Sequence, residues 1–232
     1  MKKPQFVNGE IYHVYNRGVE KRTIFLENRD YFRFIHDLFE FNNQDLAPNN
    51  SYFFNNRNSH GKNEILIRNP RKILVEILSF CLMPNHFHLM LRQISDNGVI
   101  KFMHRLGTGY TNFFNKKQER VGPLFQGRFK AVLVNDEVYL RHLLNYIHAN
   151  PLDIKFTEWR GKQLQSTKSA LNFLENYRWS SFQDYIGKRN FSSVSSRSFC
   201  LRLLGGAKEY KESLQDWLQS VNLEEVEEYT LE

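Results

Sequence analysis

The sequence predicts an α+β fold built on a ferredoxin-like antiparallel sheet, and three observations support this. Segments with strand and helix patterns follow one another in the order β-α-β-β-α-β. The two middle strand segments are joined by the tight turn Pro84-Asn85, as in a β-hairpin. A further helical segment follows the last strand. We expect the helices between the strands to cover one face of the sheet, and the last helix to cross the other face.

Each predicted element rests on the spacing of its apolar residues and on the residues at its ends. In chain order, the expected elements are strand 10–18, helix 28–41, strands 72–83 and 86–93, helix 97–117, strand 123–135 and helix 136–151. Asn28 is the expected N-cap of the first helix, and Pro151 stops the last one. Residues 42–70 are rich in Asn, Ser and Gly, which predicts a long loop or insertion.

Composition indicates a folded chain with a polyanionic partner. The net charge is +7, and residues 101–130 carry seven Lys or Arg side chains against one Glu. Such a basic segment suggests contact with phosphates, although a solvated basic helix face gives the same pattern. The two cysteines are too few for a disulfide framework or a Cys-rich zinc site. No apolar run approaches a membrane span and no signal peptide is visible, so we expect a cytoplasmic protein.

The segment CLMPNHFHLML (81–91) places two histidines in a strongly apolar neighbourhood. Because side chains alternate along a strand, His86, His88 and Met90 share one face, while Phe87 and its i+2 neighbours share the other. If the second set is core, the two imidazoles lie side by side on the opposite face. This is a metal-ligand geometry if a third ligand arrives, and otherwise a pair of ordinary half-buried histidines.

The helix after the last strand can supply that third ligand. Tyr146 and Asn150 are four residues apart in NYIHANP, so they project from one face of the helix. Crossing the second face of the sheet, this helix would bring the Asn150 amide oxygen to a metal held by His86 and His88, with the Tyr146 phenol beside it. Two imidazoles and one neutral oxygen suit Mg²⁺ or Mn²⁺ acting on a phosphodiester. Zinc fits less well, because neither thiolate nor carboxylate joins the set.

At these residues the sequence resembles a known family. The segments MPNHFHLML, GPLFQGRFKAVLV, YLRHLLNYIHANPL and YRWSSFQDYIG resemble the single-tyrosine HUH transposases of bacterial insertion sequences, and most closely the REP-associated tyrosine transposases. The resemblance runs from about Tyr12 to Gly187. It implies a single-stranded DNA transposase domain over residues 1–190, with an insertion at 42–70. Residues 191–232 would form an acidic helical C-terminal extension.

By position, the resemblance makes His86, His88 and Asn150 the metal ligands and Tyr146 the nucleophile. It implies that Tyr146 attacks the scissile phosphate of single-stranded DNA, forming a 5′-phosphotyrosine and a free 3′-hydroxyl. The implied partners are DNA hairpins or palindromic repeats, with no membrane, for a monomer or homodimer that associates with the nucleoid when bound. We assign contacts with the DNA backbone to the basic residues Arg17, Lys116, Lys117, Arg120, Arg128 and Lys130.

Other interpretations remain open from the sequence. A tyrosine in a helix is most often core or surface, and Tyr110 in the basic segment is the rival nucleophile. His148 lies near Tyr146 but on another helix face. A non-catalytic or domesticated DNA-hairpin-binding protein would need no intact set of ligands and nucleophile. A rolling-circle replication initiator or relaxase-like nickase uses the same chemistry, but usually with helicase or larger mobilisation modules, for which 232 residues leave no room.

Overall fold

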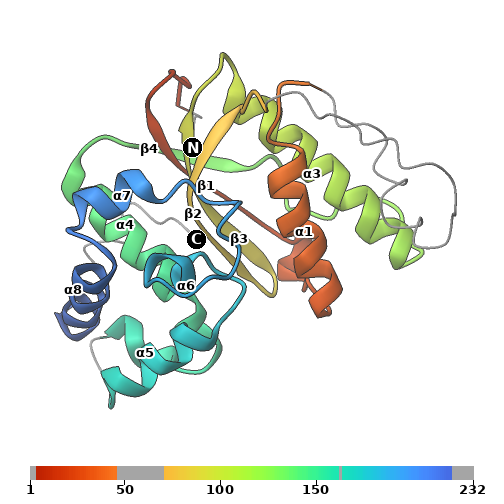
Figure 1. Cartoon of the computed structure of the whole chain (residues 1–232). Coiled ribbons are helices and arrows are strands. Elements are labelled where there is room, and N and C mark those ends of the chain that lie inside the picture. Colours follow the sequence, from red (N-terminus) through yellow and green to blue (C-terminus); the bar gives the residue numbers. More distant parts are fainter. Residues whose placement is uncertain (1–3, 46–70, 162–163, 221–232) are drawn as a thin grey trace, which may run out of the picture.

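The computed structural model describes residues 4–45, 71–161 and 164–220. Its centre is a four-stranded antiparallel sheet in the order β2-β3-β1-β4 (Figure 1). The strands are β1 (Ile11–Arg17), β2 (Val75–Met83), β3 (His86–Gln93) and β4 (Lys130–Val134). This order, with a helix after the first strand and after the third, confirms the predicted ferredoxin-like arrangement.

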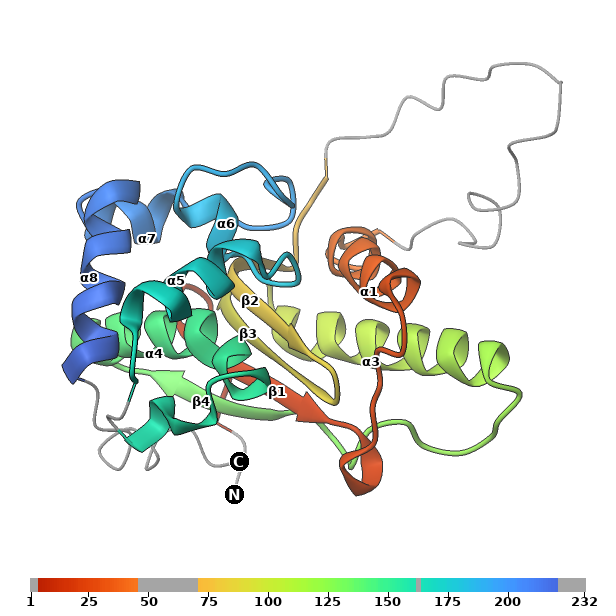
Figure 2. The same cartoon turned by 90° about the horizontal axis from the view of Figure 1, so that it is seen from below.

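Helices α1 (Asn28–Glu40) and α3 (Gly98–Lys117) pack on one face of the sheet (Figure 2). The core between them and the sheet includes Phe87, Leu89 and Leu91 of β3, together with Tyr12 and Val14 of β1. The alternation expected for residues 86–91 is therefore confirmed for its apolar half. The facing positions of both strands must turn their side chains to the other side of the sheet.

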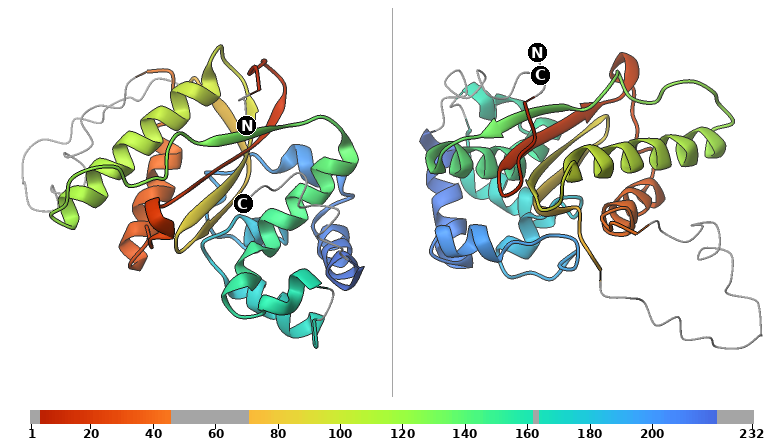
Figure 3. Two further views of the ribbon diagram at one scale, coloured as in Figure 1. Left: turned by 180° about the vertical axis from the view of Figure 1, so that it is seen from behind. Right: turned by 90° about the horizontal axis from the view of Figure 1, so that it is seen from above.

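Helix α4 (Glu137–Ala149) crosses that second face, as the sequence predicts, and further helices complete a second core around it (Figure 3). The further elements are η2 (Asn150–Ile154), η3 (Thr157–Gly161), α5 (Thr167–Asn176), α6 (Phe182–Tyr185), α7 (Ser198–Leu203) and α8 (Ala207–Ser220). Met90 of β3 belongs to this second core. Much of the second sheet face is thus covered, and the site residues on it are buried instead of lying in open solvent.

The starts of two elements, α1 and β4, differ from the sequence-based expectations. The N-cap of α1 is Glu27 instead of Asn28, because the Asp30 carboxylate accepts the backbone N–H groups of Leu26 at 2.8 Å and Glu27 at 3.2 Å. Strand β4 begins at Lys130, since the preceding residues do not continue the ladder and pair with β1 and its end through an isolated bridge at Phe125 and a side-chain hydrogen bond from Asn16 to Gly127. The expected loop 42–70 and acidic tail 191–232 fall partly outside the described residues, at 46–70 and 221–232.

A short 3-10 turn, η1 (Val19–Lys21), follows β1.

Among the residues that the structure describes, no helix has the length and apolarity needed to cross a lipid bilayer.

Candidate active site

The two histidines of β3 lie on the face of the sheet that α4 covers. The His86 and His88 rings stand edge to face with their centroids 5.1 Å apart, and both side chains are buried. His86 Nε2 lies 3.1 Å from the Asn150 side-chain oxygen, and the His88 ring meets the Tyr146 ring at 5.6 Å. The four residues singled out by the sequence therefore converge, from a strand and from a helix end more than fifty residues further along the chain.

Helix α4 is placed by signals at both of its ends. Asp136 caps its N-terminus, accepting the backbone N–H of Tyr139 at 2.7 Å. At the other end the chain tightens into η2, where Pro151 prevents continuation of the α-helix. Asn150, at the junction of the two elements, is fully buried. The i, i+4 spacing then sets Tyr146 one turn below it, on the side of the helix that faces β3.

His86, His88 and Asn150 fit a divalent metal ion. Two neighbouring ligands at about 2.1 Å from one ion lie about 3 Å apart, which matches the 3.1 Å contact between His86 Nε2 and the Asn150 oxygen. Within the described ranges, no three His, Cys, Asp or Glu side chains are grouped to hold a metal. The neutral amide oxygen of Asn150 is thus the available third donor beside the two imidazoles.

A cavity of about 470 Å³ opens beside the histidines. His86 and His88 form part of its wall together with Tyr15, and four cationic side chains line it: Arg17, Lys21, Arg128 and Lys130. Arg128 and Lys130 are exposed, while Arg17 is half-buried. Cations grouped around a concave surface concentrate positive potential there and attract phosphates. Three of the six predicted backbone-contacting residues therefore meet at one cavity next to the candidate metal ligands.

Tyr146 itself does not line this cavity. Its side chain is fully buried, with the Trp159 ring 6.5 Å away and the Arg160 guanidinium 5.6 Å from the centre of its ring. Asp153 accepts hydrogen bonds from Arg160 at 2.9 Å and 2.5 Å and from the Trp159 indole at 2.6 Å. We call Asp153, Trp159 and Arg160 the Tyr146 cover. Burial lowers the pKa of Arg160, but the hydrogen bonds that Arg160 donates to Asp153 and the nearby Tyr146 side chain outweigh this effect and raise it.

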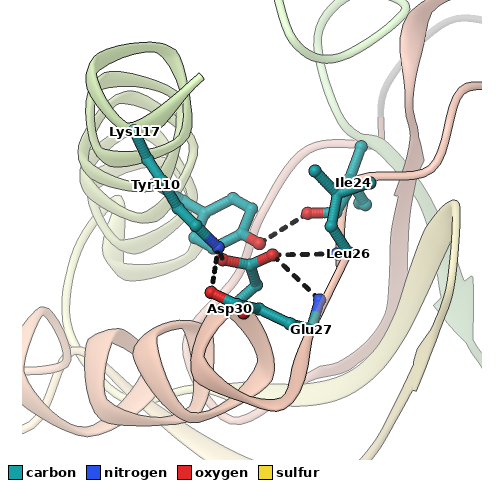
Figure 4. Close-up of polar contacts among 6 residues, drawn as sticks. All are labelled: Ile24, Leu26, Glu27, Asp30, Tyr110 and Lys117. Atoms are coloured by element: carbon teal, nitrogen blue, oxygen red, sulfur yellow. Dashed lines mark hydrogen bonds and ion pairs between the residues drawn. The ribbon is translucent and has the colours of Figure 1, made fainter. Parts of the chain in front are cut away.

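The other three predicted DNA contacts lie away from the cavity, near the end of α3. Lys116 is exposed. The Lys117 ammonium forms ion pairs with the buried Asp30 carboxylate and, at 2.6 Å, with Glu27 (Figure 4). The Arg120 guanidinium donates to the Pro123 carbonyl at 3.0 Å and to the Asn115 side chain. Lys117 and Arg120 thus have local partners that tie the end of α3 to its surroundings.

Tyr110, the alternative nucleophile, and His148, close to Tyr146 in the sequence, both have other contacts in the structure. Tyr110 is buried in the opposite core, and its hydroxyl donates to the Ile24 carbonyl at 2.6 Å (Figure 4). Burial raises the pKa of Tyr110, which disfavours the phenolate that a nucleophile needs. His148 points into the C-terminal helices, where it bonds Tyr210 at 2.6 Å and Ser181 at 2.8 Å, and burial lowers its pKa to about 3.

Sequence reasoning missed His13, Lys21 and the Tyr146 cover. The alternation of β1 could have revealed His13, because the apolar partners Tyr12 and Val14 flank it. Lys21 lies outside the basic segment and reaches the cavity through a turn in which its own φ is 58°. For Asp153 and Arg160 no sequence signal exists, since their pairing depends on the path of the chain between two 3-10 turns.

Comparison with known proteins gives a family match and a similar fold. Residues 49–150 match the family model described as IS200-like transposase. The fold is similar to the solved structure of a REP-associated tyrosine transposase bound to a REP hairpin, with a TM-score of 0.50 and 12% sequence identity over 81% of this chain and 85% of the other. No curated protein matches the chain. At this identity the structural likeness establishes the fold.

Proposed function

We propose that this chain, whose residues 49–150 match the IS200-like transposase family model, is a transposase that binds single-stranded or hairpin DNA and cleaves and rejoins it through a covalent bond to Tyr146. One observation carries this proposal. His86, His88, Tyr146 and Asn150 meet on one face of the sheet, beside a cavity lined by cations. A stable core alone would gain little from burying three polar side chains in that place.

The proposed metal ligands are His86, His88 and Asn150, and the ion is Mg²⁺ or Mn²⁺. Within the described chain, the Asn150 amide nitrogen is buried without a hydrogen-bond partner, which is costly unless the amide has a task. Bound there, the ion would withdraw charge from the non-bridging oxygens of a phosphodiester. His86 is oriented by Asn85, whose side-chain oxygen lies 2.6 Å from His86 Nδ1, leaving Nε2 on the side of Asn150.

In the proposed reaction, the Tyr146 phenolic oxygen attacks the scissile phosphorus. A bond forms between that oxygen and phosphorus, and the bond from phosphorus to the 3′ oxygen breaks. The products are a 5′-phosphotyrosine and a free 3′-hydroxyl. Because the phosphodiester is exchanged for another ester, its energy is retained, and a second 3′-hydroxyl can reverse the step without ATP. A phenol, with an ordinary pKa of about 10, is a better nucleophile and leaving group than a serine hydroxyl.

The cationic cavity is the proposed path of the DNA backbone next to the histidines. Arg17, Lys21, Arg128 and Lys130 would each neutralise a phosphate, and together they would set the register of the strand without reading its sequence. The similar solved structure holds a REP hairpin, which supports a hairpin or palindromic repeat as the substrate class. We place this activity in the cytoplasm, at the nucleoid, for a monomer or a homodimer.

A labelled single-stranded hairpin, incubated with the full chain and Mn²⁺, tests the proposal. A covalent protein–DNA band is expected for the wild type and should be absent for Tyr146→Phe, while hairpin affinity stays within about threefold. Tyr110→Phe is the matched control, since it also removes one buried phenolic oxygen, and it should retain the band. An adduct that survives Tyr146→Phe would refute the nucleophile assignment.

The burial of Tyr146 favours one second candidate, a hairpin-binding protein that does not cut. In the described conformation Tyr146 is fully buried, packs near Arg160 and does not line the cationic cavity. Cleavage therefore requires the phenol to become accessible when DNA binds, whereas binding alone does not. The same assay separates the two functions: tight hairpin binding by the wild type with no adduct, at any concentration of Mn²⁺ or Mg²⁺, would support the non-catalytic binder.

A further inference from the structure

A third histidine lies against the proposed metal site and has no part in the chemistry described above. His13 is on β1, on the same sheet face as His86 and His88, and it is fully buried. The antiparallel register places Tyr15 opposite His88 and His13 opposite Met90, so His13 is the diagonal neighbour of His88. A buried imidazole next to a metal ligand is costly unless its nitrogen atoms have partners.

The contact between the two rings is a hydrogen bond between imidazoles. His13 Nε2 lies 2.9 Å from His88 Nδ1, and the ring planes are inclined by only 16°. The Tyr15 ring stacks on both, with centroids 4.9 Å from His13 and 5.7 Å from His88. In such a bond one nitrogen donates its proton and the other accepts it. Stacking on Tyr15 restricts rotation of either ring out of this arrangement.

We propose that His13 is the positioning residue for His88: it accepts the Nδ1 proton of His88, so that the lone pair of His88 lies on Nε2, the nitrogen that would bind the divalent cation. This inference rests on the proposed function, because it assigns His88 as a ligand. The two nitrogens of an imidazole point in different directions, so a partner at Nδ1 fixes both the tautomer and the ring orientation. His13 is not itself assigned as a ligand, since its Nε2 is engaged by His88 Nδ1.

The tautomer can be read without any metal or activity. Long-range ¹H–¹⁵N spectra of the histidine-labelled full chain should show His88 protonated at Nδ1 and unprotonated at Nε2. Assignment comes from the loss of one spin system in His88→Gln. In His13→Leu, which keeps the packing but removes the acceptor, we expect His88 to show a mixture of tautomers. Wild-type protein with His88 protonated at Nε2 would overturn the proposal.

Metal affinity gives the second readout, measured as free Mn²⁺ by electron paramagnetic resonance. His13→Leu should raise the Kd for Mn²⁺ about tenfold to hundredfold, as for the loss of other partners behind metal-bound histidines. His13→Gln, whose side-chain oxygen can reach the former Nε2 position, should restore part of that loss. His104→Ala is the control, because this exposed histidine belongs to α3, on the opposite face of the sheet.

The experiments distinguish an incorrect metal site from an incorrect role of His13. If His86→Ala and Asn150→Ala leave the Mn²⁺ affinity unchanged, the proposed metal site itself is wrong. If both weaken Mn²⁺ binding while His13→Leu binds it as tightly as the wild type, the metal site stands and the role of His13 is refuted. Thermal melting of each variant without metal ensures that only folded protein is compared; should His13→Leu not fold, His13→Gln and the wild-type tautomer still decide the question.

Discussion

Lys116 and Lys117, at the end of α3, should have opposite roles, although the sequence predicts that both contact the DNA backbone. The Lys117 ammonium pairs with Asp30, a fully buried carboxylate whose other oxygen caps the start of α1 (Figure 4). Lys116 is exposed at the surface. We expect Lys117→Ala to lower stability while leaving DNA binding nearly unchanged. Lys116→Ala, its matched control, should weaken DNA binding and leave stability nearly unchanged.

The size of the expected loss in stability follows from the buried Asp30 charge that Lys117→Ala leaves without its partner. Removing one partner of a fully buried ion pair costs about 3–5 kcal/mol, because the remaining charge is uncompensated. The Lys117 side chain is 23% exposed, so water can replace part of the ion pair. Glu27 lies close to the same ammonium, so its carboxylate would repel the uncompensated Asp30 charge. A loss of about 2–3 kcal/mol is therefore expected, against less than about 0.5 kcal/mol for Lys116→Ala.

Urea unfolding followed by circular dichroism measures this difference. For a chain of this size, 2–3 kcal/mol corresponds to a fall in Tm of roughly 4–12 °C. Because its carboxylate partners raise the pKa of Lys117, despite the opposing effect of burial, the ion pair contributes from neutral pH up to that raised pKa. The difference between the variants should thus persist at about pH 9 and decline only as the pH rises through the folded-state pKa.

Hairpin binding at several salt concentrations supplies the second half of the test. Lys116→Ala should lower the salt slope by up to about one unit if Lys116 contacts a phosphate. Lys117→Ala should leave the slope unchanged. The reasoning is refuted if Lys117→Ala unfolds at the wild-type midpoint and lowers the salt slope as Lys116→Ala does, since Lys117 would then be a DNA contact and no part of the α1–α3 junction.

Three further changes test the fold around the site. Asp136→Ala removes the N-cap of α4 and should cost about 1 kcal/mol in urea unfolding, whereas Asp136→Asn should recover most of it. Gly98→Ala would bring a Cβ to 2.2 Å from the Leu74 carbonyl oxygen, so a loss of about 1–3 kcal/mol is expected by the same measurement. Despite its burial, Glu175 has a pKa lowered by two lysine partners, so Glu175→Gln should be less stable by about 0.5–1 kcal/mol at neutral pH. That difference should vanish as the pH falls through the folded-state pKa of Glu175, and one that grows in acid would contradict the sign.

Local patterns in the sequence were sufficient for the fold class and for the sheet and helix faces on which the proposed site residues lie. Alternation along 86–91 separates the two histidines from Phe87 and its neighbours, because the period of a strand is a property of the backbone itself. The i, i+4 relation of Tyr146 and Asn150 is likewise a property of any helix. Both relations depend only on residues close together in the chain, and the structure has the side chains on the expected faces.

The partners of these residues were decided by tertiary structure. His13 meets His88 only through the register of β1 on β3, and Lys117 meets Asp30 from a helix 87 positions further along the chain. The Asp153–Arg160 pair over Tyr146 depends on how two 3-10 turns fold back on α4. Register, helix packing and loop path are set by the sum of many weak contacts between distant segments. No spacing within one segment encodes them, so the sequence alone predicts which side chains share a face but not which neighbours hold them in place.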